Sequence, residues 1–320
     1  MKALVTGATG FIGSHLTEAL AARGYDVTVL TRKTSRTGWL EGLKLDYIAT
    51  DLSDIEASAR ALRGFDYVFH VAGLTKTVRE SDFFRVNTEY TSRLLKVLAE
   101  QNPGMKRFIY LSSLAAAGPS LDGRPVGEDS PALPVSTYGR SKLLAEEAVR
   151  SYQDRIPATI IRPPAVFGPR DTDFLVMFRM IKKRLFPFWG ECSYSMVYVS
   201  DLVQGIILAA EHDRALGKTY NLAHQMIYTS TDIAGEISAA LGVTPLKIRL
   251  PRSLLPVLGF IGQKIDKKGI INRDRVIDFG FTNWTCDTMM AEHDIGFRAK
   301  TTLREGIQWT ADWYRTHQWI

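Results

Sequence analysis

The first half of the chain alternates short apolar runs with longer stretches in which apolar side chains recur every three or four positions. Short apolar runs are typical of buried strands, and the longer periodicity is typical of amphipathic helices. We predict strands at residues 2–6, 26–31, 46–49, 67–71, 107–112 and 159–162. We predict helices between them at residues 12–23, 54–63, 81–101 and 138–152. This alternation predicts βαβ units and a parallel sheet in an α/β fold.

The pattern changes after Gly168, where the predicted strands become shorter and helices more frequent. The helices that we predict there cover residues 174–184, 201–211, 231–241 and 302–317. The last helix carries an apolar face with a cluster of tryptophans beside it, at Leu303, Ile307, Tyr314, Trp309, Trp313 and Trp319. We interpret it as a helix that caps a core. The pattern predicts a sheet domain over residues 1–168 and a smaller, mainly C-terminal lobe over 169–320, with segments near 197–223 rejoining the sheet.

The composition fits a folded chain that needs neither disulfides nor a structural metal for stability. The chain has 320 residues, of which 45% are hydrophobic and 23% charged, which favours about two domains at roughly 150 residues each. The formal net charge is +6, but the basic residues are scattered among acidic ones. This distribution indicates a solvated mixed surface, so we predict no nucleic-acid partner.

The cysteines and the apolar runs indicate the cellular setting. Cys192 and Cys286 are far apart and follow no metal-ligand spacing, so we predict neither a disulfide framework nor a metal site. We see no segment with the roughly 18–20 apolar residues of a membrane span, and no signal-peptide pattern at the N-terminus. We therefore expect a cytoplasmic protein.

Three spaced glycines follow the first predicted strand and open the first predicted helix. Residues 6–13 read TGATGFIG and contain Gly7, Gly10 and Gly13. Such glycines permit a tight turn, a close backbone approach to a pyrophosphate, and close packing of helix on strand. The helix N-terminus, with Phe11 and Ile12 in its first turn, offers free N–H groups to phosphates. The strand–turn–helix context predicts a dinucleotide-binding loop rather than an incidental glycine-rich turn.

A tyrosine and a lysine stand four residues apart in a predicted helix, at Tyr138 and Lys142. Residues at this spacing share one helix face. A tyrosine with its ordinary pKa near 10 is a poor base at pH 7, and a neighbouring ammonium lowers that pKa. The pair is common by chance, but its place directly after the fifth strand and its loop favours an acid–base role.

Taken together, these motifs resemble the extended branch of the short-chain dehydrogenase/reductase superfamily, the NAD-dependent epimerase/dehydratase family. Further segments carry the resemblance along almost the whole chain: HVAG at 70–73, RPPAVFGP at 162–169, VSDL at 199–202 and YNL at 220–222. The double proline is most similar to dihydroflavonol reductase and 3β-hydroxysteroid dehydrogenase-like members. The resemblance implies a Rossmann-type doubly wound parallel sheet with a smaller substrate lobe, and a homodimer that pairs helices 81–101 and 138–152.

The resemblance also implies roles for individual residues. Ser113 would hydrogen-bond the substrate oxygen, with the neighbouring Ser112 as the alternative. Tyr138 would be the acid or base, and Lys142 would support it and contact the nicotinamide ribose. The further cofactor-binding positions are Asp51 and Leu52 at the adenine, and Ala72, Gly73, Asn87, Pro163 and Val166. For Asn87, an ordinary helix asparagine is the alternative.

Cations rather than a carboxylate follow the second strand. NAD-preferring sites carry an acidic residue there, which binds the ribose hydroxyls. This sequence has Arg32 and Lys33 at that place, with Arg36 just beyond. Arginine side chains bind phosphate oxygens through charge-assisted hydrogen bonds. We therefore predict NADP as the cofactor, with NAD as the alternative.

The expected function is hydride transfer between a nicotinamide cofactor and a carbonyl or secondary alcohol of a hydrophobic small molecule. Dehydratases carry an Asp-Glu pair after the active-site serine, where this chain has Leu114 and Ala115. Nucleotide-sugar enzymes carry an arginine at the position of Tyr194, although Arg170 or Arg249 could replace it. A nucleotide-sugar epimerase that retains its cofactor is the alternative, and a non-catalytic NADP(H) sensor is a third.

Two segments of the second lobe bear on the substrate and on membranes. An aromatic and apolar group could line a hydrophobic pocket or form ordinary core, at Phe174, Met177, Phe178, Phe186, Phe188 and Trp189. Within residues 253–268, the run 254–261 is nearly all apolar, and it is flanked by basic residues at Arg249, Arg252, Lys264, Lys267 and Lys268. This segment could touch a membrane surface peripherally or form a buried helix that closes the pocket.

Overall fold

The computed structural model describes residues 1–255, 257, 260 and 273–320. In this part of the chain, seven parallel strands form one sheet in the order β10-β6-β5-β4-β1-β2-β3. These strands are β1 (Lys2–Thr6), β2 (Asp26–Thr31), β3 (Asp46–Ala49), β4 (Tyr67–His70), β5 (Arg107–Leu111), β6 (Ala158–Arg162) and β10 (Thr219–Asn221). The predicted parallel α/β sheet is confirmed, and its predicted strands agree within one residue at each end.

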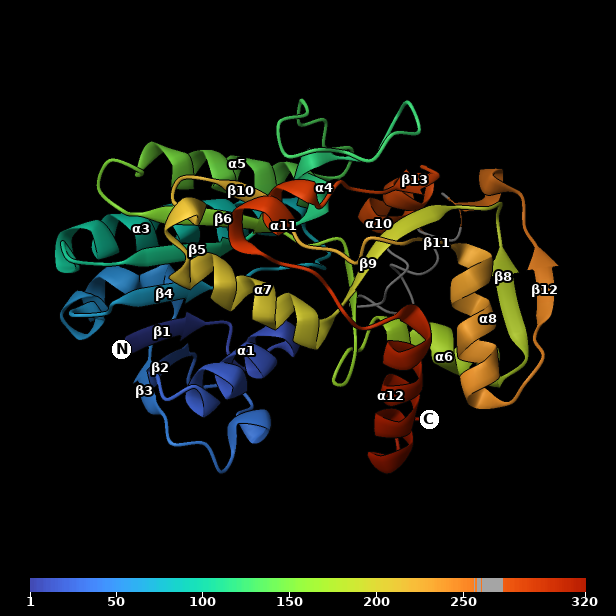
Figure 1. The fold of residues 1–320 in the computed structure, drawn as a ribbon, viewed down its shortest axis with the longest axis horizontal. Coiled ribbons are helices and arrows are strands. Elements are labelled where there is room, and N and C mark those ends of the chain that lie inside the picture. The colour runs from blue at the N-terminus through green and yellow to red at the C-terminus, as the bar shows by residue number, and fades with distance from the viewer. Residues whose placement is uncertain (256, 258–259, 261–272) are drawn as a thin grey trace.

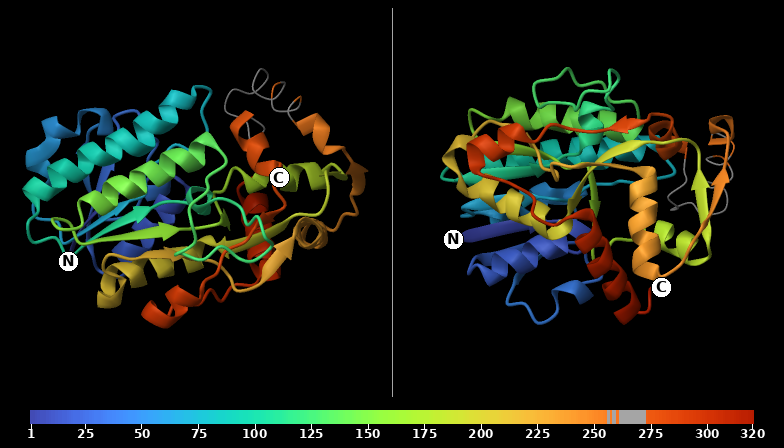
Figure 2. Two further views of the ribbon diagram at one scale, coloured as in Figure 1. Left: turned by 90° about the horizontal axis from the view of Figure 1, so that it is seen from above. Right: turned by 45° about the vertical axis from the view of Figure 1, so that its right-hand side comes forward.

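Helices cover both faces of this sheet. One face packs against α1 (Phe11–Ala22) and α7 (Val199–Glu211), where Leu16 and Ile206 are fully buried. The other face packs against α3 (Tyr90–Gln101) and α5 (Thr137–Ser151), where Leu94 and Val149 are fully buried. The left view of Figure 2 shows α3 and α5 on one side of the strands and α7 on the other. This is the doubly wound arrangement that the alternating pattern predicts.

Two predicted helices differ from the structure. The predicted helix at 54–63 is wrong, because η2 (Leu52–Leu62) consists of 3₁₀ turns with non-helical dihedrals at Asp54. The Asp51 side chain caps the start of this segment by accepting a hydrogen bond from the Ser53 N–H at 2.8 Å, and the helical path is interrupted at Asp54, with φ −136° and ψ 40°. The predicted helix at 81–101 divides into α2 (Glu80–Phe83), a π-helical segment η3 (Phe84–Glu89) and α3.

The second lobe has its own small sheets and core. Strand β9 (Ser193–Tyr198) pairs with β7 (Ala165–Phe167), β11 (Ile227–Thr229) and β13 (Asn283–Trp284), and β8 (Leu185–Phe188) pairs with β12 (Leu246–Arg249). The helices here are α6 (Phe174–Lys182), α8 (Ser230–Leu241), α10 (Arg273–Phe279), α11 (Met289–Ile295) and α12 (Leu303–Thr316). The remaining short elements of the described residues are η1 (Gly38–Leu40), α4 (Leu114–Ala117), η4 (Asp213–Ala215) and η5 (Arg252–Leu254). Figures 1 and 2 show this lobe opposite the N-terminus, and therefore beside the carboxyl ends of the parallel strands.

The predicted tryptophan cluster forms only in part. The rings of Trp313 and Trp319 lie 4.9 Å apart, and Trp39 joins them at 5.6 Å from Trp313. Trp309 instead packs on Tyr198 at 5.5 Å and remains half exposed. The cluster therefore ties the end of the chain to the segment that follows β2.

The membrane predictions have different outcomes. Among the described residues, no helix has the length and apolar content needed to cross a bilayer. The predicted peripheral contact through residues 253–268 lies mostly outside the described residues, so it stays a prediction.

Candidate active site

The glycine loop connects β1 to α1 with very little space around it. Gly7 has a φ of +72°, and a Cβ there would lie 2.6 Å from the Ala72 amide nitrogen. A Cβ at Gly13 would lie 2.0 Å from the Gly7 carbonyl oxygen. Gly10 stands at the N-cap of α1, with Phe11 and Ile12 behind it. The loop therefore leaves room for backbone only, which fits the close approach of a dinucleotide pyrophosphate to a helix N-terminus.

The segment after β2 presents cations to solvent. Arg32, Lys33 and Arg36 are all exposed, and among the described residues none of them forms an ion pair with a carboxylate. The pKa of Asp51 lies below its ordinary value, chiefly because its carboxylate accepts the Ser53 N–H, with a smaller contribution from the charge of Arg32. Leu52 beside it is buried. The predicted ribose and adenine residues thus lie at neighbouring strand ends.

The pair Tyr138 and Lys142 lies on one face of α5. The Tyr138 ring is half buried and packs 5.8 Å from the Phe83 ring. Lys142 is buried, and its Nζ donates a hydrogen bond to the Leu111 carbonyl oxygen at 2.6 Å. The same ammonium lies 4.4 Å from the centre of the Tyr110 ring. The helix thus directs a buried cation to the end of β5, one turn from the tyrosine.

Burial governs the charge of Lys142. Desolvation lowers the pKa of this ammonium to about 7, and the charge of Glu146 opposes that shift. A Cβ at Gly73 would lie 3.6 Å from Lys142 Nζ and 3.3 Å from Asn87 Oδ1. Gly73 is therefore the small residue that admits the ammonium beside the end of β4.

The two neighbouring serines have different partners. Ser112 is buried, and its hydroxyl donates to Glu146 Oε1 at 2.6 Å. Ser113 is half buried and caps α4, accepting the Ala115 N–H at 3.2 Å. The structure therefore favours Ser113 over Ser112 as the hydroxyl that remains accessible to a ligand.

A close backbone contact brings these helices together. A Cβ at Gly139 would lie 2.3 Å from the Ala115 carbonyl oxygen, so only glycine permits α5 to approach α4 this closely. Gly139 directly follows Tyr138, and Ser113 caps α4. We did not single out Gly139 from the sequence, although its place after the tyrosine is a usable signal.

The remaining predicted cofactor residues lie at the same edge of the sheet. Asn87 is buried, accepts the Leu74 N–H at 2.7 Å, and donates to Ser141 Oγ at 2.9 Å. It thereby joins the segment after β4 to α5, which is more than an ordinary helix asparagine does. Ala72 donates its N–H to Thr6 Oγ1 at 3.2 Å, and Pro163 accepts the Leu114 N–H at 2.9 Å. Val166 is half buried in β7.

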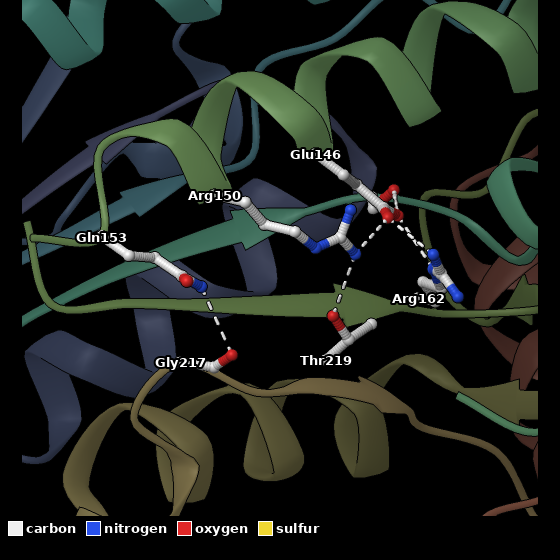
Figure 3. Close-up of polar contacts among 7 residues, drawn as sticks. Glu146, Arg150, Gln153, Arg162, Gly217 and Thr219 are labelled. Carbon is white, nitrogen blue, oxygen red and sulfur yellow. Dashed lines mark hydrogen bonds and ion pairs between the residues drawn. The ribbon is translucent and has the colours of Figure 1, made fainter. Parts of the chain in front are cut away.

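Two acidic residues near Tyr138 were missed by the sequence analysis. Asp274 of α10 accepts the backbone N–H groups of Thr137 at 2.7 Å and Tyr138 at 3.1 Å, and so caps α5. Glu146 is buried on α5 and pairs with Arg162 (Figure 3). Asp274 gives no local signal, since its partners are more than a hundred residues away. Glu146 has one, because it continues the four-residue spacing of Tyr138 and Lys142.

Comparison with known proteins decides the family. The model of the NAD-dependent epimerase/dehydratase family matches residues 3–223, which include the glycine loop, Tyr138 and Lys142. The chain belongs to this family. The resemblance inferred from the motifs is therefore confirmed, and with it the Rossmann-type fold.

This member of the epimerase/dehydratase family is similar to several proteins whose names specify a substrate or a bound ligand. A ceramide reductase from Caulobacter vibrioides is 32% identical over 327 residues, covering 99% of this chain and 95% of that protein. A decarboxylating sterol-4-alpha-carboxylate 3-dehydrogenase from Bos taurus is 32% identical over 229 residues, covering 68% of this chain and 63% of that protein. The solved structure of MoeE5 in complex with UDP-glucose and NAD has a TM-score of 0.81 at 25% identity, covering 99% of this chain and all of that one. These relatives identify an NAD(P)-dependent enzyme of the oxidoreductase and epimerase type.

This family member differs from the nucleotide-sugar pattern in the second lobe. Tyr194, at the position where we expected an arginine in such enzymes, lies on β9, and burial raises its pKa. Arg170 could replace that arginine. Its guanidinium, however, donates to Glu18 Oε1 at 2.6 Å and lies over the Trp39 ring, so it is already bound to α1 and to the tryptophan cluster. Arg249 is exposed on β12.

The predicted aromatic pocket is largely core. Phe178 is fully buried, with its ring 5.1 Å from that of Tyr314, and Phe186 is nearly so. Phe174, Met177 and Phe188 pack around this core while keeping part of their surface exposed. Trp189 is half-buried as well, with its ring 5.7 Å from that of Phe279, so these four side chains could still contact a ligand.

Proposed function

We propose that this enzyme is an NADP(H)-dependent reductase or dehydrogenase that acts on a hydrophobic carbonyl compound or the matching secondary alcohol. The observation that carries the proposal is the buried Lys142 ammonium, which lies on the Tyr138 face of α5 and is hydrogen-bonded to the end of β5. Ser113 contributes the third polar group at the same edge of the sheet.

The three side chains have complementary roles in this proposal. Tyr138 gives a proton to the substrate oxygen during reduction and takes it back during oxidation. Lys142 stabilises the phenolate that this transfer leaves, because an adjacent cation favours the charged form. Ser113 orients the substrate oxygen by a hydrogen bond. The nicotinamide, when bound, supplies the hydride chemistry, and the protein supplies alignment.

The residues assigned to the cofactor divide by the part that they would bind. Gly7, Gly10 and Gly13, with the first turn of α1, would hold the pyrophosphate, and Arg32 and Arg36 the 2′-phosphate. Asp51 and Leu52 would contact the adenine. Ala72, Gly73, Asn87, Pro163 and Val166 would border the nicotinamide half. The exposed cations and the missing carboxylate support NADP over NAD.

Two observations favour a hydrophobic substrate. Tyr194 stands where a nucleotide-sugar enzyme would carry an arginine to bind the diphosphate. Arg170, which could replace that arginine, donates a hydrogen bond to Glu18 instead. The names of two relatives specify a ceramide and a sterol carboxylate, which are lipids. We therefore propose a lipid-like carbonyl compound, bound between the edge of the sheet and the lobe at 169–320, rather than a nucleotide sugar.

The test is net consumption of cofactor. Purified enzyme is incubated with NADPH and a series of ketones of increasing chain length, and absorbance at the nicotinamide band is followed. The proposal predicts stoichiometric NADPH oxidation that grows with substrate hydrophobicity. Interconversion of UDP-sugars with no net change in cofactor would instead establish the epimerase.

We also propose a homodimer through the exposed faces of α3 and α5. Leu144 on α5 is an apolar side chain with 42% of its surface exposed, which fits a helix that packs on a second copy. Leu144→Glu should convert the dimer to a monomer in sedimentation velocity, and a wild-type monomer at micromolar concentration would refute the idea.

A further inference from the structure

Glu146 is a buried carboxylate in which every oxygen has two partners. Oε1 accepts hydrogen bonds from Ser112 Oγ at 2.6 Å and Arg162 Nε at 2.9 Å. Oε2 accepts from Arg162 Nη2 at 2.6 Å and Arg150 Nη2 at 2.9 Å. Figure 3 shows the carboxylate between the two arginines, with Arg162 at the end of β6. Such a site is costly to bury unless it is fully paired, as it is here.

The cluster joins the strand ends that carry the proposed active site. Ser112 directly precedes Ser113 at the end of β5. Arg162 ends β6 and directly precedes Pro163. Glu146 therefore fastens α5 to both strand ends at once, and each contact lies one residue from a position proposed to bind substrate or cofactor.

The same carboxylate lies one helical turn from Lys142. Both residues are on the buried face of α5, where water screens charges less than at the surface, and the charge of Glu146 favours the Lys142 ammonium. The Nζ of Lys142 also faces the Leu111 carbonyl and the Tyr110 ring. Each of these neighbours is uncharged near neutral pH.

Other titratable groups around Lys142 do not supply a negative charge. Burial raises the pKa of Tyr110 well above 10, so its phenol stays neutral. Burial, and secondarily the charge of Lys142, lowers the pKa of His70 to about 3, so its ring stays neutral as well. Tyr138 on α5 is the group whose phenolate form the Lys142 ammonium is proposed to stabilise. Glu146 is then the carboxylate identified as acting on Lys142 within the described part of the chain.

We propose that Glu146 is a positioning residue for the reaction. Its carboxylate supplies the counter-charge that keeps the Lys142 ammonium charged beside Tyr138. Its hydrogen bonds to Ser112 and Arg162 align the ends of β5 and β6. This inference rests on the proposed function. It goes beyond a structural ion pair, because an ion pair alone would stabilise the fold without changing the titration of Lys142.

The direction of the expected effect follows from the charges. Burial favours the neutral amine of Lys142, and Glu146 favours the ammonium. Removing the negative charge therefore lowers the pKa of Lys142 from about 7. The ammonium is then lost at lower pH, and support for the Tyr138 phenolate is lost with it. The alkaline limb of the kcat profile should move to lower pH.

The test uses Glu146→Gln, which keeps the shape of the side chain and removes its charge. We expect the alkaline limb of kcat to shift down by about one pH unit, equivalent to about a tenfold loss at pH 8, with the KM for NADPH changed less than about twofold. An unshifted limb would overturn the proposal.

A second variant covers failure of the first to fold, since Glu146→Gln leaves Arg162 as a buried cation without a partner. The double variant Glu146→Gln, Arg162→Met removes both charges. This double variant should fold, and the pKa of Lys142 in it should still be lower than in wild type. A double variant with wild-type titration would show that the pair only stabilises the fold.

The matched control is Arg150→Gln. Arg150 binds the same carboxylate from its solvent side, through Nη2, and its side chain is 38% exposed. The variant removes one ion pair from Glu146 and leaves the buried charge in place. Its pH profile should match that of wild type, and a shift as large as that of Glu146→Gln would contradict the assignment.

A measurement without turnover separates this inference from the proposed function. Proteins labelled with ¹³C at lysine Cε are titrated by NMR, and Lys142→Arg assigns the signal. Wild type should show one lysine that titrates near neutral pH, and Glu146→Gln should titrate lower. This result would support the role of Glu146 even if no ketone were reduced, whereas identical titration in both proteins would refute it.

Discussion

At the scale of single residues, Lys142 shows how position changes chemistry. A lysine in water remains charged well above neutral pH, whereas this one is buried against Tyr110 and has a pKa of about 7. The four-residue spacing to Tyr138 could be predicted from the sequence. The place of Glu146 four residues after Lys142 could be predicted as well, but its pairing with Arg162 and the cap by Asp274 could not, because these two contacts depend on packing between distant segments.

Tyr138→Phe removes the exchangeable proton and keeps the ring that packs against Phe83. We expect kcat to fall about 100-fold or more, in line with the usual contribution of general acid–base catalysis. The Kd for NADPH, measured by fluorescence quenching, should change less than about twofold. Turnover near the wild-type rate would remove Tyr138 from the acid–base role.

Arg32→Ala combined with Arg36→Ala removes the exposed cations that follow β2. We expect the KM for NADPH to rise about tenfold or more while the KM for NADH changes little, because charge-assisted hydrogen bonds to a phosphate are lost. The control Arg155→Ala removes an exposed arginine that precedes β6, which is separated from β2 in the sheet by β5, β4 and β1. Equal losses for both cofactors would argue against a 2′-phosphate site.

At the scale of elements, β1, β2, β4, β5 and β6 were predictable because each has a buried apolar run bounded by turns, whereas β3 was predicted although it is largely exposed. The helix expected at 54–63 was wrong, since the backbone leaves helical dihedrals at Asp54 and continues as 3₁₀ turns. The helix expected at 81–101 contains the π-helical segment η3, which carries Asn87. From this segment Asn87 contacts Leu74 and Ser141, and no local pattern in the sequence reveals these contacts.

Gly13→Ala tests the contact between α1 and the glycine loop. The new Cβ would lie 2.0 Å from the Gly7 carbonyl oxygen, so the helix must move away from the loop. We expect loss of NADPH binding by calorimetry and a lower Tm. Gly235→Ala is the matched control, because its Cβ meets nothing within 4 Å and the site is inside α8, where alanine favours helix by about 0.5–1 kcal/mol. Normal binding by the Gly13 variant would contradict the account.

At the scale of the whole molecule, the sheet and its helices bury a histidine whose protonation is unfavourable in the folded state. His70 is fully buried in β4, hydrogen-bonded to Thr6 Oγ1 at 2.7 Å and to Thr91 Oγ1 at 2.9 Å. It joins β1, β4 and α3 as a neutral ring. Its protonation therefore opposes the packing of the whole domain.

Acid should destabilise the fold through His70. Burial lowers its folded-state pKa to about 3, below the ordinary value of 6.5. The stability that this group contributes is present above pH 6.5 and is lost as the pH falls from about 6.5 towards 3. Urea unfolding at several pH values should show a shallower decline of the unfolding free energy towards acid for His70→Gln than for wild type. Equal slopes for wild type and His70→Gln would refute this role.

The central claim is net hydride transfer from NADPH to a carbonyl carbon. The most direct measurement uses NADPH deuterated at nicotinamide C4, with the product analysed by mass spectrometry alongside cofactor absorbance. The account predicts one deuterium in the alcohol product for each NADPH consumed. Epimerised product without deuterium from added NADPH, and without net cofactor oxidation, would contradict it.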